Sequence, residues 1–208
     1  MSADPSQEKK ASLHDAYAAD YDAQVRLYDC YTAEALFGLC YEYTEPGQKL
    51  LDAGIGSGLS AQFFTKAGLC VYGMDFSPAM LEICRAKGIA LELKLGDVQQ
   101  KPWPYPPQAF DIVVCCGVTH FVPDLETIFS EAERVLRAGG YFALTSKSPV
   151  SLDAGEKYEK VTSGELEVFS HSPQYLEDLF NLNGFERRKV LRCYVGQDIF
   201  YVWAVQKK

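Results

Sequence analysis

The sequence predicts a single α/β domain built on a doubly wound, mostly parallel sheet. Short apolar runs typical of buried strands alternate along the chain with segments of helical periodicity. Several of these strand-like runs end in an aspartate, and the first of them leads directly into a glycine-rich loop. The 208 residues, 48% of them hydrophobic, can bury one substantial core but are too few for two full domains.

The glycine-rich loop is the strongest indication of function. Gly54, Gly56 and Gly58 follow Asp52 at the end of an apolar strand. Glycine permits positive φ and lets a ligand approach backbone N–H groups that a Cβ would block, so the loop predicts a cradle for a nucleotide-type cofactor. The third glycine of a dinucleotide fingerprint would stand at position 59, which is Leu59, so a dinucleotide is disfavoured. Asp52 adds an acceptor that favours a cofactor with a positively charged group.

Two further strand-like runs end in an acid. The run 69–75 ends at Asp75, about 20 residues beyond the loop, which is the spacing of a carboxylate that binds ribose hydroxyls. The run 91–97 ends at Asp97, whose side chain can accept from an adenine amino group. We expect these strand ends to converge on one site.

Five motifs, taken in order, resemble class I S-adenosylmethionine-dependent methyltransferases of the small-molecule type (methyltransferase domains 11 and 25). They are the D-A-G-x-G-x-G loop, the turn at 74–81, Gly96-Asp97-Val98, the run 110–116 and the segment 133–142. The likeness spans residues 45–146. It implies a Rossmann-like, seven-stranded sheet and methyl transfer from S-adenosyl-L-methionine to a small-molecule acceptor, with release of S-adenosylhomocysteine.

The resemblance also implies which residues contact the cofactor. The contacts run from its methionyl end to its adenine: Asp52, Gly54, Ile55 and Gly56 at the methionyl end, Cys116 and Gly117 beside the methyl group, Asp75 at the ribose with Phe76 and Met80 nearby, and Asp97 and Val98 at the adenine.

The N-terminal segment 1–45 is expected to form helices ahead of the first strand. Ser12, with Asp15 three residues later, indicates a capped helix through about Asp20, and residues 32–43 have the apolar spacing of a second helix. In the resembled family such a segment lies over the cofactor as a lid.

Tyr17, Tyr21 and Tyr28 are candidate contacts of this lid, and Tyr17 is also a candidate on the acceptor side. The pair Tyr21-Asp22 is similar to one found in the family. The Tyr21 phenol can bond a methionyl carboxylate while its ring covers the sulfonium. The alternative is an ordinary buried aromatic stripe on a helix.

The core region 46–146 contains three more expected helices, over 59–67, 77–87 and 124–138. The segment 101–107 holds four prolines, which remove backbone donors and fix φ. It is predicted to be a rigid surface connection without a function of its own.

The C-terminal region 147–208 departs from the strand and helix alternation. A helix is expected from Ser172 to about Asn183, followed by strands over 187–194 and 199–205. Two strands joined by so short a turn must pair antiparallel. The resembled family closes its sheet with such a hairpin, whereas dinucleotide-binding domains lack it.

The acceptor side is less well specified. His120 follows the strand at 110–116 and is the candidate general base for a hydroxyl, thiol or acidic carbon; the alternative is a structural imidazole at a strand end. His171 and Arg192 are candidates for the pocket mouth, where they would pair with an anionic acceptor, and capping or surface roles are the alternative. No Asp/Asn-Pro-Pro motif follows this strand, which disfavours adenine or glutamine amino groups as substrates.

Composition narrows the partners. The formal net charge of −8 disfavours nucleic acid, and the one tight basic cluster, residues 187–189, is expected at a solvated strand or loop edge. No apolar run reaches the roughly 20 residues that span a bilayer, and residues 1–10 lack the apolar core of a signal peptide. We therefore expect a cytoplasmic monomer or homodimer without a membrane or nucleic-acid partner.

The cysteines leave an alternative function open. Seven of them, without a C-x-x-C pair, predict reduced thiols and no metal site. Soft thiolates together with His120 would nevertheless suit methylation of a metalloid such as arsenite. A catalytically silent cofactor-binding subunit or sensor is the third possibility, because a fold does not determine function.

Overall fold

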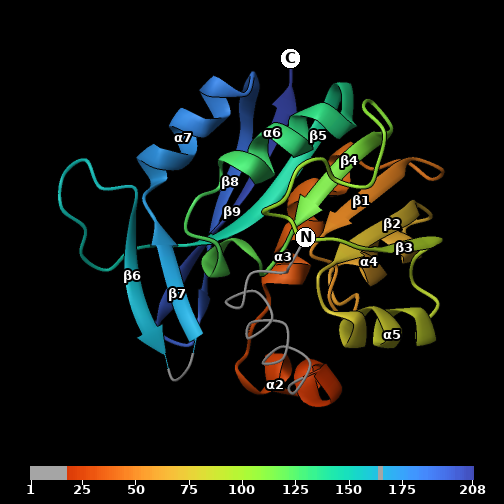
Figure 1. Ribbon diagram of the computed structural model, residues 1–208, viewed down its shortest axis with the longest axis horizontal. Helices are drawn as coiled ribbons and strands as arrows, with labels where there is room; N and C mark the ends of the chain where they lie inside the picture. Colours follow the sequence, from red (N-terminus) through yellow and green to blue (C-terminus); the bar gives the residue numbers. More distant parts are fainter. Residues whose placement is uncertain (1–17, 164–165) are drawn as a thin grey trace, which may run out of the picture.

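The computed structural model describes residues 18–163 and 166–208, and its centre is a seven-stranded sheet of order β3-β2-β1-β4-β5-β9-β8 (Figure 1). Neighbours from β3 through β5 are parallel, whereas β9 is antiparallel to both β5 and β8. The predicted seven-stranded, mostly parallel sheet with a C-terminal antiparallel hairpin is confirmed. The strands are β1 (Lys49–Ala53), β2 (Cys70–Asp75), β3 (Glu92–Leu95), β4 (Phe110–Cys115), β5 (Leu136–Lys147), β8 (Phe185–Val195) and β9 (Asp198–Lys207).

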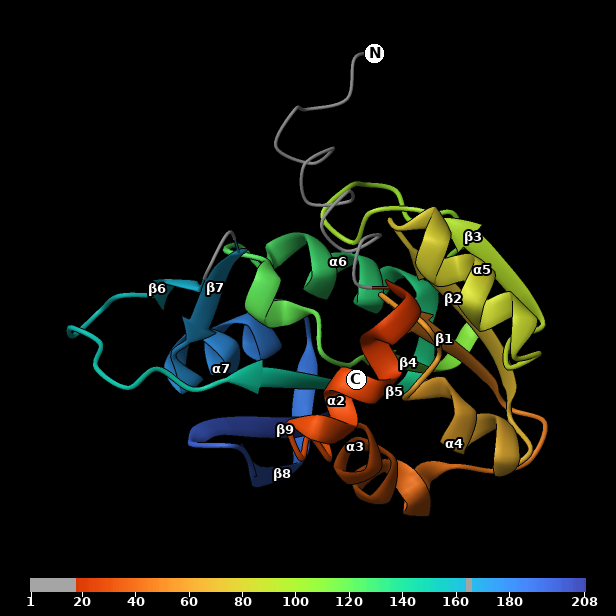
Figure 2. The same cartoon turned by 90° about the horizontal axis from the view of Figure 1, so that it is seen from below.

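Helices cover both faces of this sheet. Because side chains alternate along a strand, Val113 and Cys115 of β4 enter one core and Ile112 and Val114 the other. The first core is closed by α6 (Glu126–Val135) and α7 (Pro173–Leu182), and the second by α3 (Thr32–Cys40), α4 (Ala61–Lys66) and α5 (Pro78–Ala86). Figure 2 shows α6 and α3 on opposite sides of β4 and β5. No helix of the described residues is long and apolar enough to cross a membrane.

The predicted helix starts at 77 and 172 are confirmed by their caps. Ser77 Oγ accepts from the Met80 amide at 3.1 Å, and Ser172 Oγ accepts from the Tyr175 amide at the same distance. A proline follows each capping serine, where its missing N–H costs no helical bond.

The predicted end of the third core helix, at residue 138, is wrong. This helix, α6, ends at Val135, and Leu136 begins β5 instead of continuing to residue 138. Leu136 is buried and pairs with Phe110 on β4. Apolar spacing alone predicts that Leu136 is buried but does not distinguish a helix from a strand there.

The N-terminal helices differ in part from the prediction. The helix expected over 12–20 lies mostly outside the described residues, which begin with a 3₁₀ turn, η1 (Ala18–Asp20). It leads into α2 (Tyr21–Leu27), which was not predicted. The helix expected over 32–43 is confirmed as α3 followed by the 3₁₀ turn η2 (Tyr41–Tyr43).

A second, two-stranded sheet was missed. Strands β6 (Tyr158–Ser163) and β7 (Leu166–His171) pair antiparallel and stand apart from the main sheet in Figure 1. β7 contacts β5 and η3 (Thr119–Phe121), the turn that follows β4. Charged residues such as Lys160 and Glu167, which form an ion pair across the hairpin, weaken its hydrophobic signal in the sequence.

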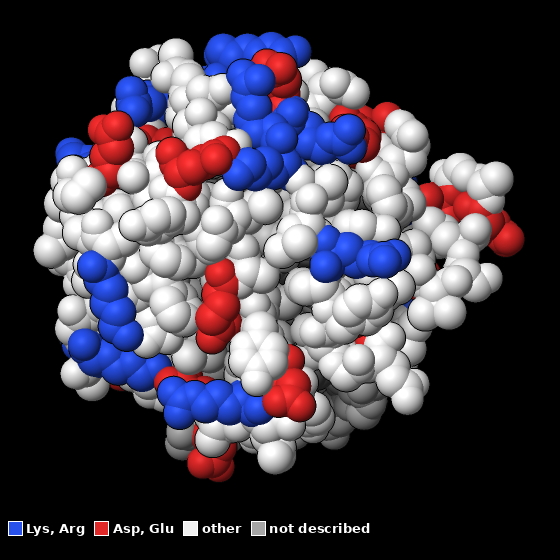
Figure 3. All heavy atoms as spheres, turned by 180° about the vertical axis from the view of Figure 1, so that it is seen from behind, with Lys and Arg blue, Asp and Glu red and all other residues white. Residues whose placement is uncertain are grey.

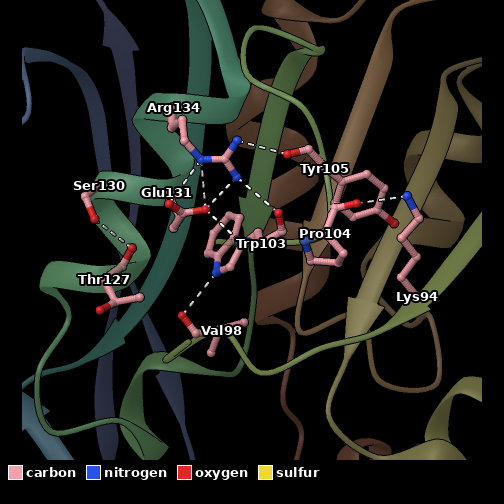
Figure 4. A network of polar contacts seen from close by, with 9 residues as sticks. All are labelled: Lys94, Val98, Trp103, Pro104, Tyr105, Thr127, Ser130, Glu131 and Arg134. Carbon is pink, nitrogen blue, oxygen red and sulfur yellow. Dashed lines mark hydrogen bonds and ion pairs between the residues drawn. The ribbon is translucent and has the colours of Figure 1, made fainter. Parts of the chain in front are cut away.

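The proline-rich segment runs along the surface as predicted, with its four prolines exposed, but Trp103 and Tyr105 belong to the hydrophobic core, which was not predicted. Two residues of α6 fix its backbone, as Figure 4 shows. The Trp103 amide donates to Glu131 Oε2 at 2.7 Å, and the Arg134 guanidinium donates to the carbonyls of Tyr105 at 2.9 Å and Trp103 at 3.2 Å. Arg134 also pairs with Glu131 at 2.6 Å. Side chains of α6 thus supply the hydrogen bonds that this segment does not make to a neighbouring strand.

Replacement of Arg134 by methionine should destabilise the protein by about 3 kcal/mol, because it leaves the buried Glu131 carboxylate without its cation and two carbonyls without their donor. Urea unfolding followed by circular dichroism measures the change. Lys160→Met, which breaks an exposed ion pair with Glu167, is the matched control and should have little effect. Equal stability of the two variants would contradict the structural role of Arg134.

Candidate active site

A cavity of about 370 Å³ lies where the carboxyl ends of the parallel strands meet. The strand register places Asp52 of β1 beside Gly73 of β2 and Val114 of β4, so the loops after these strands share one edge. Every residue predicted to contact the cofactor lines this cavity except Asp52, and His120 lines it as well: Tyr21, Gly54, Ile55, Gly56, Asp75, Phe76, Met80, Asp97, Val98, Cys116, Gly117 and His120.

The glycine-rich loop is held by the end of β2. The amides of Gly54 and Ile55 donate to the Met74 carbonyl at 2.8 and 3.0 Å, and the Gly56 amide donates to Asp75 Oδ2 at 2.8 Å. The expectation that these amides face a ligand is therefore wrong, because protein acceptors already use them.

The loop glycines serve two different purposes. Gly54, at φ +84°, has no room for a side chain, because a Cβ there would lie 2.4 Å from Val118 Cγ2. Gly56, at φ +52°, lines the cavity, and no atom lies within 4 Å of the position its Cβ would occupy. Gly54 permits close packing, whereas Gly56 leaves space on the cavity side of the loop.

Asp75 and Asp97 are the charged residues of the described cavity wall. Asp75 accepts from the Gly56 amide through Oδ2 and from the Ser77 amide at 2.9 Å through Oδ1. Asp97 accepts from the Gln99 amide at 2.8 Å. Backbone hydrogen bonds therefore orient both carboxylates before any ligand arrives.

Asp52 is fully buried and does not line the cavity. Ser60, which does line it, donates to Asp52 Oδ2 at 2.6 Å. Oδ1 has no hydrogen-bond partner among the described residues. Burial raises the pKa of Asp52 to about 7, and the nearby Asp75 adds to the rise while Ser60 opposes it. A nearby positive charge would favour its ionised form.

The helix α2, in the segment predicted to form a lid, supplies part of the cavity wall. Tyr21 lines it, and its hydroxyl lies 4.0 Å from where a Cβ of Gly117 would be. Burial, followed by the nearby Cys116 and Cys30, raises the pKa of the Tyr21 phenol above its usual range, so the hydroxyl keeps its proton and can donate. Tyr21 lines the cavity and Tyr28 is 67% exposed, so the alternative of a buried aromatic stripe does not hold for them. Tyr17 lies outside the described residues.

The proline-rich segment supports the Asp97 end of the cavity. Trp103 Nε1 donates to the Val98 carbonyl at 3.2 Å, as Figure 4 shows, and the Tyr105 hydroxyl donates to the Gly73 carbonyl at 2.8 Å. Neither contact was predicted, because hydrogen bonds from these two side chains to backbone carbonyls leave no pattern in the sequence.

His120 lies in η3, and the hydroxyl and carbonyl of Thr145 on β5 hold the segment around it. The Gly117 amide donates to Thr145 Oγ1 at 2.8 Å, and Thr119 Oγ1 donates to the Thr145 carbonyl at 2.6 Å. The imidazole packs against the ring of Phe121 and meets Phe200 of β9 edge to face, with centroids 5.7 Å apart. The structure brings His120 to the same cavity as the predicted cofactor residues.

His171 and Arg192 do not line the cavity, contrary to the prediction. His171 is fully buried, with Nε2 3.3 Å from the Pro123 carbonyl, and burial lowers the pKa of its imidazole to about 4. Arg192 is exposed on β8 and lies over the ring of Tyr194. No lysine or arginine lines the cavity within the described part of the chain.

The basic cluster at 187–189 is compensated by acids. Arg187 pairs with Glu177, Arg188 with Glu186 at 3.0 Å, and Lys189 with Glu42 at 2.8 Å. Figure 3 shows the back of the molecule, where lysine and arginine side chains are interspersed with acidic ones. This arrangement agrees with the expected solvated strand edge.

Several wall residues were not predicted, and most of them are apolar. They come from α2 and the chain after it, from η3 and the residue after it, and from the β8–β9 hairpin, and include Val25, Cys30, Phe121, Val122, Val195 and Phe200. They are distant in sequence and share no motif. All seven cysteines are free, and the described residues contain no group of three side chains arranged to bind a metal ion.

Comparison with known proteins identifies the family. The "Methyltransferase domain" family matches residues 51–144. The phosphatidylethanolamine N-methyltransferase of Cereibacter sphaeroides is 30% identical over 168 residues, which cover 68% of this chain and 81% of that protein. The chain belongs to the class I S-adenosylmethionine-dependent methyltransferases. Its cofactor is S-adenosyl-L-methionine.

Other methyltransferases agree with this identification. The malonyl-[acyl-carrier protein] O-methyltransferase of Serratia marcescens is 32% identical over 164 residues, covering 78% of this chain and 62% of that protein. The chain thus spans less than two thirds of that relative's length. The crystal structure of 1,6-didemethyltoxoflavin-N1-methyltransferase from Burkholderia thailandensis shares the fold, with a TM-score of 0.73 at 17% identity over all of this chain and 92% of that one.

The residues of this methyltransferase fit its cofactor. The orphaned Oδ1 of Asp52 and the two carboxylates on the wall suit a ligand that carries positive charge and hydroxyl donors. The space at Gly56 admits a group that any side chain there would displace.

The raised pKa of Asp52 predicts a pH-dependent stability. In the unfolded chain an aspartate has a pKa of about 4, so between pH 4 and 7 the folded state retains a proton that the unfolded state releases. The stability that this carboxyl contributes is present below about pH 4 and is lost as pH rises through about 7. Relative to Asp52→Asn, the wild-type free energy of unfolding should fall by on the order of 4 kcal/mol across this range. Urea unfolding of both proteins at pH 4.5, 6 and 8 measures the difference, and parallel pH profiles would contradict the assignment.

Proposed function

We propose that this methyltransferase transfers the methyl group of S-adenosylmethionine to a neutral, largely apolar small molecule that carries an O–H or N–H group. The observation that carries the proposal is the composition of one cavity wall. It combines two oriented carboxylates with apolar side chains and a single histidine, and its described residues include no lysine or arginine.

The cofactor half of the proposal follows from the positions of the acids. Asp75 would accept from the ribose hydroxyls, and Asp97, with the backbone at Val98, would meet the adenine. Tyr21 would donate to the methionyl carboxylate. Asp52, which Ser60 separates from the cavity, would favour the positive charge of the sulfonium. When bound, the cofactor supplies an electrophilic methyl group on its sulfonium.

The acceptor half follows from the remaining wall. Val122, Val195, Phe121 and Phe200 offer apolar surface around His120. An anionic acceptor, such as the carboxylate that the name malonyl-[acyl-carrier protein] O-methyltransferase implies for that relative, would find no cation on the described wall and would lose hydration without compensation. A neutral hydroxyl or amine pays no such penalty, and the His120 imidazole can take its proton.

The metalloid alternative receives little support. Cys30 and Cys116 both line the cavity, but burial raises the pKa of the Cys116 thiol well above its usual range. A soft metalloid ion needs thiolates, so this wall is poorly suited to it. A silent cofactor-binding subunit remains the outcome in which the cofactor binds and no acceptor is turned over.

Asp75→Ala should weaken S-adenosylhomocysteine binding at least 100-fold, because it removes the proposed ribose acceptor and the anchor of the Gly56 amide. Isothermal titration calorimetry measures the affinity. Asp75→Asn, which keeps the side-chain shape, guards against misfolding of the alanine variant, and the exposed Asp153→Ala is the control. Absence of binding to the wild-type protein would refute the proposed cofactor site.

His120→Ala should lower kcat about 100-fold and leave cofactor affinity within twofold of wild type, because general-base catalysis contributes on that scale. The measurement is a screen of phenols, neutral hydroxyls, amines and carboxylates with isotopically labelled donor, followed by kinetics on the best acceptor. A carboxylate as the best acceptor, or unchanged kcat in the variant, would count against the proposal.

A further inference from the structure

The helix α2, the proposed lid, has no fully buried side chain, and its apolar residues Tyr21 and Val25 are half-buried. It is 7 residues long and none of them is buried, while isolated helices need roughly 12–15 residues to be stable in water. Its N-cap residue, Asp20, makes no side-chain capping bond. Leu27 is 80% exposed and Tyr28, just after the helix, is 67% exposed. So short a helix needs polar contacts with the body of the protein in addition to this partial burial.

The carboxylate of Asp22 makes these polar contacts. Ser57 Oγ of the glycine-rich loop donates to Asp22 Oδ1 at 2.5 Å, and Lys87 Nζ, at the end of α5, donates to Oδ2 at 2.5 Å. Lys87 Nζ also donates to the Ser57 carbonyl at 2.9 Å, so the three residues close a triangle. Within the described part of the chain, Asp22 provides the hydrogen bonds from an α2 side chain to the body.

The environment of this triangle strengthens it. Ser57 is buried, and the side chains of Asp22 and Lys87 are only 27% and 32% exposed. Charge-assisted hydrogen bonds that are partly shielded from water are stronger than exposed surface ion pairs. Lys87 also follows the C-terminus of α5, where the helix dipole favours a positive charge.

We propose that Asp22 is a positioning residue that pins the lid to the loop beneath it and so holds Tyr21 over the methyl-donor site. Tyr21 is the preceding residue and lines the cavity near Gly117. Fixing the backbone at Asp22 restricts where the Tyr21 phenol can lie. The inference rests on the proposed cofactor role of Tyr21. It implies that the hydrogen bonds among Asp22, Lys87 and Ser57 must break before the cofactor can enter or leave.

One test needs no cofactor. Trypsin cleaves after Arg26, an exposed residue within α2, only when the helix opens. Asp22→Ala and Lys87→Met should each accelerate this cleavage about tenfold in the full chain, on the scale of a lost hydrogen bond to a charged group. Lys87→Arg should restore slow cleavage. Arg85→Met, which breaks the exposed pair with Glu82 on the same helix, should behave as wild type.

The second test measures function. Asp22→Ala should raise the KM for S-adenosylmethionine and the dissociation rate of S-adenosylhomocysteine about tenfold, with kcat at saturating cofactor within twofold of wild type. The double variant Asp22→Ala, Lys87→Met should be no worse than either single variant, because both break one triangle. Mass spectrometry of the digest and stopped-flow displacement provide the readouts.

The outcomes separate the two proposals. A wild-type protein that binds no cofactor refutes the proposed function, while the proteolysis still tests the pin. Unchanged cleavage after Arg26 in Asp22→Ala overturns the pin. Faster cleavage with unchanged KM and dissociation overturns the positioning role, because the helix would then be released without consequence for Tyr21.

Discussion

The attachment of the glycine-rich loop to the end of β2 is the interaction on which the site depends. Consecutive amides at 54–56 donate to the Met74 carbonyl and to Asp75, so the loop has no freedom to move away from the second strand. Those amides are then unavailable to an anion, in contrast to phosphate-binding loops, whose amides point at the ligand. The chemistry left to the site is that of carboxylate acceptors, which suits a nucleoside with a cationic group better than a pyrophosphate.

The same loop also contacts α2, the proposed lid. The Gly56 amide donates to Asp75, and the hydroxyl of the next residue, Ser57, donates to Asp22 of α2. Through these two bonds α2 is positioned relative to the acids that would bind the cofactor. The acceptor side rests on a separate set of supports, in which Thr145 of β5 holds η3 and Phe200 of β9 packs on His120.

The separate supports of the cofactor side and the acceptor side explain which residues the sequence could predict. Asp52, Asp75 and Asp97 each lie at the end of a strand-like run with a clear local pattern, so short motifs predicted the fold class and most of the residues that line one cavity. The burial of Trp103 was missed because the residues that satisfy its backbone, Glu131 and Arg134, lie on α6, 28 and 31 residues further along the chain. Proline content describes the local backbone, and it says nothing of a distant side chain that satisfies that backbone.

The sequence predicted the acceptor-side residues poorly for a related reason, which concerns pairing between strands. His171 precedes a Ser-Pro helix start and so resembles an exposed loop residue, but in β7 it stands opposite Tyr158 and is buried against Tyr175. Neither strand of that hairpin has enough apolar periodicity to reveal the pairing. A parallel sheet brings its strand ends to one edge whatever the sequence, whereas the hairpins and turns around His120 are placed by contacts specific to this chain. Local sequence motifs can therefore predict the cofactor. The acceptor depends on how η3, β7 and β9 pack together, which such motifs do not predict.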